Sequence, residues 1–167
     1  MVGLAAELGI ARGTLYRWTG DRERLLSDIL WADLDGLLTT LLRRPPERGR
    51  AGIQAIAMRF LELLTTGDLL VTILRTEGDT AFRLITDPKG RVRPGLVERL
   101  AAHIQQEVDE GFYRPPEEPH LLAEGMITIG ERFLYNGGNV SANPDPATAY
   151  RIMSLLIREE SNPPGSE

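Results

Sequence analysis

Apolar residues recur at helical spacing over most of this chain. The longest periodic segment covers about residues 22–42 and would form a helix on the order of 30 Å long. Further periodic segments predict helices over about 52–64, 68–76, 79–86, 94–108, 119–135 and 146–158. No segment alternates convincingly in the manner of a strand. The pattern therefore predicts an all-α fold of seven or eight helices.

The last two predicted helices are apolar over more than one face. A helix of this kind must bury more than one face, either at the centre of one subunit's core or between that core and a second subunit. A homodimer is therefore one of two interpretations. Its interface would contain Leu122, Ile127, Leu134, Ile152, Leu155 and Leu156.

Two short segments at the start of the chain are joined by a glycine turn. Leu4 and Leu8 supply the apolar side of the first segment, and Gly9 can adopt the positive φ that ends a helix sharply. Leu15 is the apolar anchor of the second segment, and polar residues surround it. This layout predicts a helix-turn-helix, in which the second helix enters the major groove of DNA.

The charge distribution bears on this prediction. The net charge of −5 argues at first against a nucleic-acid-binding protein. However, residues 1–24 hold four arginines against three acidic residues, whereas residues 45–167 hold 13 basic and 18 acidic residues. Positive charge is therefore concentrated where the DNA-reading helix would lie.

Other classes of protein lack support in the sequence. The chain has no cysteine and two histidines, so we expect no metal site and no cofactor. No apolar run approaches the roughly 18 residues that a membrane span needs, and no signal peptide is recognised, so the expected location is the cytoplasm. We expect that the protein is not an enzyme, because the sequence contains no nucleophile triad, zinc-protease motif, phosphate-binding loop or dinucleotide glycine pattern.

The residues 9–18, GIARGTLYRW, and 20–26, GDRERLL, resemble the TetR family of transcriptional regulators. The Gly-Thr-Leu-Tyr core and the following Gly-x-basic-x-x-Leu-Leu occur at the family's spacing. The resemblance covers about the first 40 residues. The rest is similar in helical architecture, with a fainter likeness to the QsdR-type regulatory domain. The resemblance implies a homodimer formed through the last two helices, a palindromic double-stranded DNA operator and a small-molecule effector.

The candidate DNA contacts lie on the second segment and just after it. Arg12 and Thr14 are placed to read base edges, and Gly13 permits close approach of the backbone. By resemblance, Tyr16 and Arg22 would contact phosphates, and Arg17 would lie near the groove or backbone. Tyr16 and Trp18 could instead be core residues, and we favour this interpretation for Trp18. For Arg24 we favour a solvated surface position.

The sequence departs from the family pattern at three points. Ala11 stands where the family has a capping Ser or Thr, whose loss removes roughly 0.5–2 kcal/mol. Thr19 stands where the family often has Phe. The family also has a helix before this motif, whereas this sequence enters the motif at Met1. We therefore expect either a start placed too far downstream or an incomplete DNA-binding domain with weak operator affinity.

The predicted domains are residues 1–42 for DNA binding, 43–160 for effector binding and dimerisation, and 161–167 as a disordered tail. The effector-contacting residues expected first are Phe60, Arg75, Phe82, His103, Met126, Ile129, Arg132 and Phe133. A wider pool adds Leu64, Ile73, Glu77, Leu100, Ile104, Tyr135 and Asn136. For His103 alone, a structural role is the favoured interpretation. The QsdR-type likeness implies a lactone or another small acyl compound as effector.

The predicted function is a ligand-responsive transcriptional repressor that its effector releases from DNA. The alternative is a dimeric ligand-binding module that has lost DNA binding through truncation. The salt dependence of DNA binding would separate the two, because phosphate contacts give a steep dependence.

Overall fold

The computed structural model describes residues 1–43, 47–136, 139–140 and 145–158, and over these the chain is helical as predicted. The disordered tail expected at 161–167 lies outside the described residues. The elements in chain order are α1 (Val2–Glu7), α2 (Arg12–Thr19), α3 (Arg22–Arg43), α4 (Gly49–Thr66), α5 (Asp68–Thr86), α6 (Val92–Asp109), α7 (Pro119–Leu134), β1 (Tyr135–Asn136), β2 (Asn139–Val140) and α8 (Pro146–Leu156).

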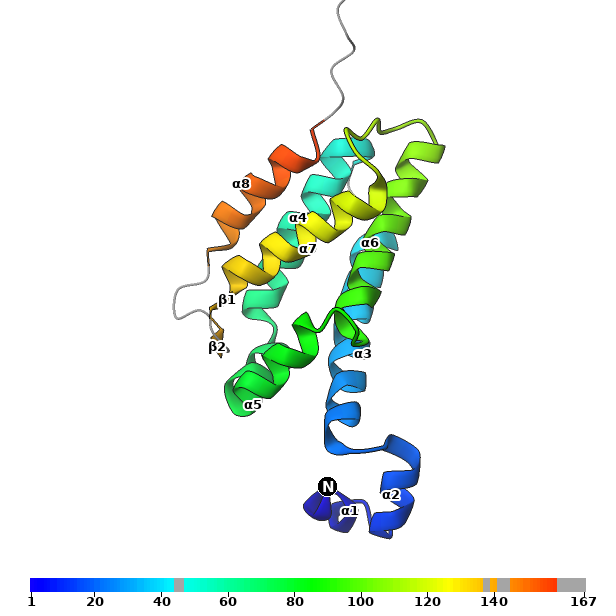
Figure 1. The fold of residues 1–167 in the computed structure, drawn as a ribbon, viewed down its shortest axis with the longest axis vertical. Coiled ribbons are helices and arrows are strands. Elements are labelled where there is room, and N and C mark those ends of the chain that lie inside the picture. Colours follow the sequence, from blue (N-terminus) through cyan, green and yellow to red (C-terminus); the bar gives the residue numbers. More distant parts are fainter. Residues whose placement is uncertain (44–46, 137–138, 141–144, 159–167) are drawn as a thin grey trace, which may run out of the picture.

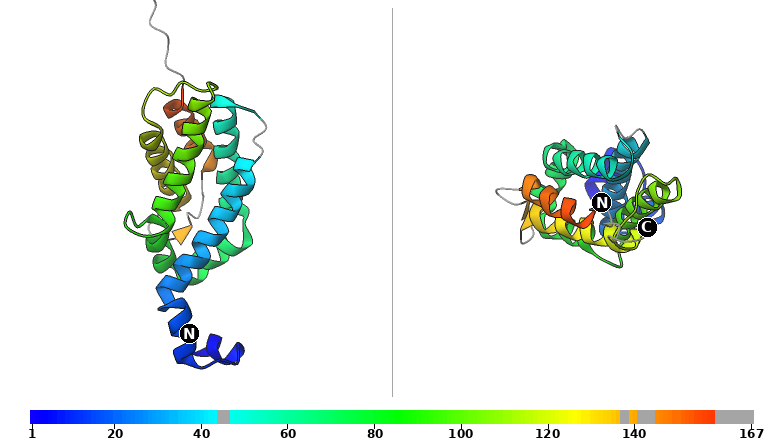
Figure 2. Two further views of the ribbon diagram at one scale, coloured as in Figure 1. Left: turned by 90° about the vertical axis from the view of Figure 1, so that its right-hand side faces the viewer. Right: turned by 90° about the horizontal axis from the view of Figure 1, so that it is seen from above.

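The helices form a bundle from which a small unit projects at one end. Figure 1 shows α1 and α2 below the bundle, joined to it by the long helix α3, and Figure 2 shows the same projection from the side. In the bundle, α6 packs on α7, α7 packs on α8, and α8 also packs on α4. Helix α3 contacts α4, α5 and α6. It therefore connects the projecting unit directly to the helices of the bundle.

The core follows from the helical repeat. Leu30, Leu34 and Leu38 recur every four residues on α3, so they share one face, and each is at least 96% buried. Ile53 and Ile56 supply the corresponding buried face of α4. None of the helices, over the described residues, is long and apolar enough to span a membrane.

Helix α5 differs from the prediction of two separate helices. Residues 68–76 and 79–86 belong to one helix that is kinked at Gly78, where φ is 44° and ψ is −115°. Such a positive φ is readily available to glycine, which lacks a Cβ atom. The predicted break is therefore present as a kink within one helix, and no loop separates the two halves.

A pair of two-residue strands was not predicted. Backbone pairing joins Tyr135 to Val140 and Asn136 to Asn139 in antiparallel register. Strands this short offer no alternation of apolar and polar residues from which a sequence could reveal them.

A buried carboxylate joins the start of α4 to the end of α6. Glu107 is 2% exposed and accepts hydrogen bonds from the Gly49 backbone N–H at 2.5 Å and from Arg48 Nε at 2.9 Å. The Arg48 guanidinium also lies over the Phe112 ring, 4.1 Å from its centre. The burial of Glu107 is thus compensated by a charged partner and a backbone donor.

Candidate DNA interface and effector cavity

The turn between α1 and α2 has the geometry that the sequence predicts. Gly9 has a φ of 64°. Its N–H donates to Ala6 O at 3.2 Å, while the Ile10 N–H donates to Ala5 O at 3.1 Å. These two bonds close the end of α1 in a Schellman motif. Ala5 and Leu15, which are 2% and 3% exposed, are the buried residues of the two helices.

The caps of the next two helices differ in kind. Ala11 precedes α2 and makes no side-chain cap, as its methyl group requires, so backbone bonds alone begin that helix. At the start of α3, Asp21 Oδ1 accepts a hydrogen bond from the Arg24 N–H at 2.8 Å. Asp21 therefore acts as the N-cap of α3.

The predicted DNA contacts are placed mainly on the outer side of α2. Arg12, Gly13 and Arg17 are exposed, Tyr16 is 43% exposed, and Thr14 is half-buried. Positions 12 and 16 are four residues apart, as are positions 13 and 17, so these four exposed positions form two adjoining rows on α2, whereas Leu15 is buried.

The expectation that Trp18 belongs to the core is wrong for the described chain, because its side chain is 68% exposed. Trp18 lies three residues after the inward-facing Leu15, and the surrounding described helices do not cover it. Arg24 is exposed, in agreement with a solvated position.

Three ion pairs connect the first turns of α3 to the region of α5. Arg22 Nη2 lies 2.5 Å from Glu77 Oε1, and Arg83 Nη2 lies 2.7 Å from Glu23 Oε1. The third pair joins Arg91, just after α5, to Asp28 at 2.7 Å. Arg22, which by resemblance would face a phosphate, is thus held by a carboxylate of the regulatory half. The Glu77 carboxylate raises the pKa of the Arg22 guanidinium further above its ordinary value.

An apolar cavity of about 60 Å³ lies inside the bundle. All of its described lining residues except Glu131 are apolar or glycine. They come from six helices, namely Leu34, Leu38, Ile56, Ala57, Phe60, Leu61, Leu64, Ile85, Leu96, Leu100, Met126, Ile127, Gly130, Glu131 and Met153. Drug-sized ligands occupy pockets of about 300–1,000 Å³. A ligand of that size would therefore have to push the helices apart.

The cavity contains part of the predicted effector set. Phe60 and Met126 line it, as do Leu64 and Leu100 of the wider pool. The remaining first-choice residues lie elsewhere. Arg75 and Arg132 are exposed, while Phe82, Ile129 and Phe133 are half-buried away from the lining, and His103 is buried on α6. The side chain of Tyr135 is outside the described part of the chain.

His103 has the structural surroundings that the sequence favoured. It is 7% exposed and lies four residues before Glu107 on α6. Burial lowers the pKa of its imidazole, and the Glu107 carboxylate acts in the opposite direction. His103 is therefore a buried residue of α6 that does not line the cavity, and its Nε2 forms no hydrogen bond with the described residues.

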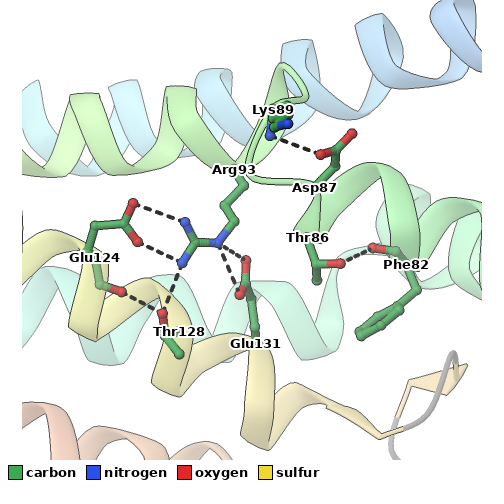
Figure 3. Close-up of polar contacts among 8 residues, drawn as sticks. All are labelled: Phe82, Thr86, Asp87, Lys89, Arg93, Glu124, Thr128 and Glu131. Atoms are coloured by element: carbon green, nitrogen blue, oxygen red, sulfur yellow. Dashed lines mark hydrogen bonds and ion pairs between the residues drawn. The ribbon is translucent and has the colours of Figure 1, made fainter.

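Glu131 lines the cavity but was not among the effector-contacting residues predicted from the sequence. As Figure 3 shows, the Arg93 guanidinium lies between Glu124 and Glu131. Arg93 donates to Glu124 and to Thr128 Oγ1 at 2.9 Å, whereas its Nε is 3.3 and 3.4 Å from the two Glu131 oxygens. Burial raises the pKa of the Glu131 carboxyl, although the Arg93 charge lowers it. The pairing spans 38 residues of sequence, so local periodicity gives no sign of it.

The predicted dimer residues are distributed between the surface and the interior. Leu155 on α8 is 71% exposed, and Ile152 and Leu156 are half-buried. Leu122 is 4% exposed within the subunit, and Ile127 lines the cavity. Leu134 ends α7, and its side chain is outside the described part. Leu121, which lies next to Leu122, is 57% exposed and was not selected from the sequence.

Comparisons with known proteins agree with this architecture. The structure is similar to that of the R. erythropolis transcriptional repressor QsdR from the TetR family, with a TM-score of 0.78 and 23% sequence identity. The match covers 95% of this chain and 86% of that chain. No curated protein sequence matches the chain significantly. Residues 48–158 match the family described as "Tetracyclin repressor-like, C-terminal domain". Because that match covers most of the chain, the chain belongs to the tetracycline repressor-like (TetR) family of transcriptional regulators.

Proposed function

We propose that this chain is a homodimeric transcriptional repressor whose α2 helix reads a palindromic operator. In this proposal Arg12, Gly13 and Thr14 face base edges, and Tyr16, Arg17 and Arg22 contact the DNA backbone. A small molecule that enters the bundle cavity releases the protein from DNA.

The observation that carries the proposal is the pair of contacts made by α5. Ile85, near the C-terminal end of α5, lines the cavity. On either side of the Gly78 kink, Glu77 and Arg83 hold Arg22 and Glu23 in the first turn of α3. A ligand that displaces α5 therefore displaces the helix that follows the DNA-reading unit.

The cavity volume supports the same mechanism. A volume of about 60 Å³ is too small for a typical effector without helix movement. Effector binding would then favour a conformation with more widely separated helices, and the differential affinity for that conformation would shift the population. Since operator half-sites require a fixed spacing of about 34–36 Å, a change in the direction of α3 would lower operator affinity.

The proposed dimer interface lies on α7 and α8, which pack together on one side of the bundle (Figure 2). Leu121 and Leu155 are exposed there, although both are large apolar residues. A second subunit would remove them from water. Leu122 stabilises the subunit's own core and is not part of this interface.

The test is a titration of fluorescent DNA selected from a random pool by the full chain. We expect specific binding whose affinity falls steeply with salt, because each neutralised phosphate contributes a slope of about −0.9. Arg17→Ala should reduce that slope, whereas Arg59→Ala, at an exposed position on α4, should not. Failure to select any sequence would favour the ligand-binding module without DNA binding.

A further inference from the structure

The polar end of the cavity differs in chemistry from its walls. Glu131 lines the cavity on α7, and its Oε1 forms no hydrogen bond with any described residue. The nearest cation, Arg93 Nε, is 3.3 Å from this oxygen without hydrogen-bond geometry. A residue that lines an otherwise apolar space therefore carries a covered acceptor oxygen without a hydrogen-bond partner, which a ligand would reach as the helices move apart.

The two terminal nitrogens of Arg93 are committed to partners other than Glu131. Its Nη1 is 3.1 Å from Glu124 Oε1, and its Nη2 donates to Thr128 at 2.9 Å while lying 2.7 Å from Glu124 Oε2. Figure 3 shows that these contacts lie on the side of the guanidinium away from Glu131. The remaining donor, Nε, donates to Glu131 Oε2 at 3.4 Å. Among the atoms of this cluster, Glu131 Oε1 is therefore the acceptor left for a ligand, because the donors of Arg93 are already occupied.

The charge of the cluster adds a second constraint. One arginine lies between two carboxylates, so the group Arg93, Glu124 and Glu131 carries a net negative charge when all three are ionised. An anionic ligand head in this low-dielectric space would be repelled. An uncharged donor would instead supply the hydrogen bond that Glu131 Oε1 lacks, and bonds to ionised acceptors are the stronger kind.

We propose that the effectors of this cavity are uncharged amphiphiles with an aliphatic chain and a terminal O–H or N–H donor, which Glu131 recognises. The inference rests on the proposed function of the cavity as the effector site. The inference separates the acyl compounds expected from the sequence into those that would bind and those that would not. An acyl amide or an alcohol offers a donor, whereas a simple ester or lactone ring offers acceptors alone, and a fatty acid offers a charge.

The test compares three ligands with the full chain at pH 8, which favours the ionised form of Glu131. 1-Octanol carries the donor, its isomer heptyl methyl ether carries the same atoms without one, and octanoate carries a negative charge. Binding is followed through the ¹³C methyl signals of Met126 and Met153, which line the cavity. The methyl signals of Met1 and Met58, which are not lining residues, serve as internal controls.

We expect 1-octanol to bind at least about tenfold more tightly than either comparison ligand, the smallest ratio that a charge-assisted hydrogen bond gives. Glu131→Met should bring the alcohol and the ether to within about twofold of each other. Glu131→Gln keeps an acceptor of the same shape, so it should retain part of the preference for the alcohol and lose the discrimination against octanoate. The Gln variant preserves the test if Glu131→Met does not fold.

Equal binding of alcohol and ether by the unmodified chain, or octanoate binding as tightly as the alcohol, overturns the inference and leaves the cavity as the effector site. If no ligand moves the Met126 or Met153 signals, the cavity itself is not the effector site. In that case this inference is wrong, whereas the DNA titration still tests the proposed repressor function by itself.

Discussion

The replacement Gly130→Ala tests the cavity without adding charge or polarity. Gly130 lies on α7 and lines the cavity. A Cβ atom at this position would be 3.3 Å from Met153 Cε and 3.7 Å from Leu61 Cδ2. The closer neighbour is the free end of a flexible side chain, so it can move by the few tenths of an ångström that the new methyl group requires.

The expected effect on stability is a gain. Alanine is favoured over glycine inside a helix by about 0.5–1 kcal/mol, and the buried methyl adds about 0.8 kcal/mol less the cost of moving Met153. We take a net gain of about 1 kcal/mol in the free energy of unfolding. For a chain of 167 residues this corresponds to a rise in Tm of about 2–4 °C.

The expected effect on effector binding is a loss. The cavity holds only about 60 Å³, and Gly130 is one of its lining residues, so a methyl group added there takes up part of the space that a ligand needs. Overpacking of this kind costs at least about 1 kcal/mol, so 1-octanol should bind about fivefold or more weakly.

The assay combines thermal unfolding with titration of 1-octanol. Gly36→Ala is the matched control, because Gly36 is exposed within α3 and a Cβ there would meet no atom within 4 Å. The control should raise Tm to a similar extent and leave ligand affinity unchanged. If Gly130→Ala is stabilised and still binds the ligand with the affinity of the unmodified chain, the ligand does not occupy this cavity and the reasoning is refuted.

Three further expectations concern the charges and the surface. Glu77→Gln should release Arg22, so operator affinity should rise and the response to effector should shrink in a DNA titration; unchanged values would contradict the proposed role of this ion pair. Leu155→Glu should give a monomer in analytical ultracentrifugation, whereas a variant that remains dimeric would place the interface elsewhere. Because burial lowers the pKa of His103 below its ordinary 6.5, the unfolded chain binds more protons between that folded pKa and pH 6.5. The free energy of unfolding, measured by urea titration, should therefore fall as pH decreases below 6.5. This fall should be shallower in His103→Gln. If the variant shows the same dependence of unfolding free energy on pH, His103 is not its cause.

Local features account for the parts of the fold that the sequence predicted. The positive φ of Gly9 and the burial of Leu15 depend on neighbours within a few residues, so they can be predicted from the sequence. Periodicity likewise placed the helices. It missed the continuity of α5, because the positive φ at Gly78 is compatible both with a helix end and with a kink.

The site was less predictable because it depends on distant partners. Phe60 and Met126 were selected as apolar residues on inward faces, and both line the cavity. The same criterion selected Phe133, which packs elsewhere. Glu131 carries the polar chemistry of the cavity, yet its environment comes from Arg93 on another helix. Periodicity shows on which face of its helix a residue lies, but it does not show which other helix packs against that face.

The two ion pairs around the α5 kink have a consequence for how the protein responds to ionic conditions. Arg22 and Glu23 are neighbours of opposite charge, and their partners Glu77 and Arg83 lie on opposite sides of Gly78. Both pairs form together at the observed bend, so the first turn of α3 favours this shape of α5. Exposed pairs of this kind are screened when the Debye length shortens. The fold-change in operator affinity caused by effector should therefore decline as salt rises, a dependence separate from the effect of salt on DNA affinity itself.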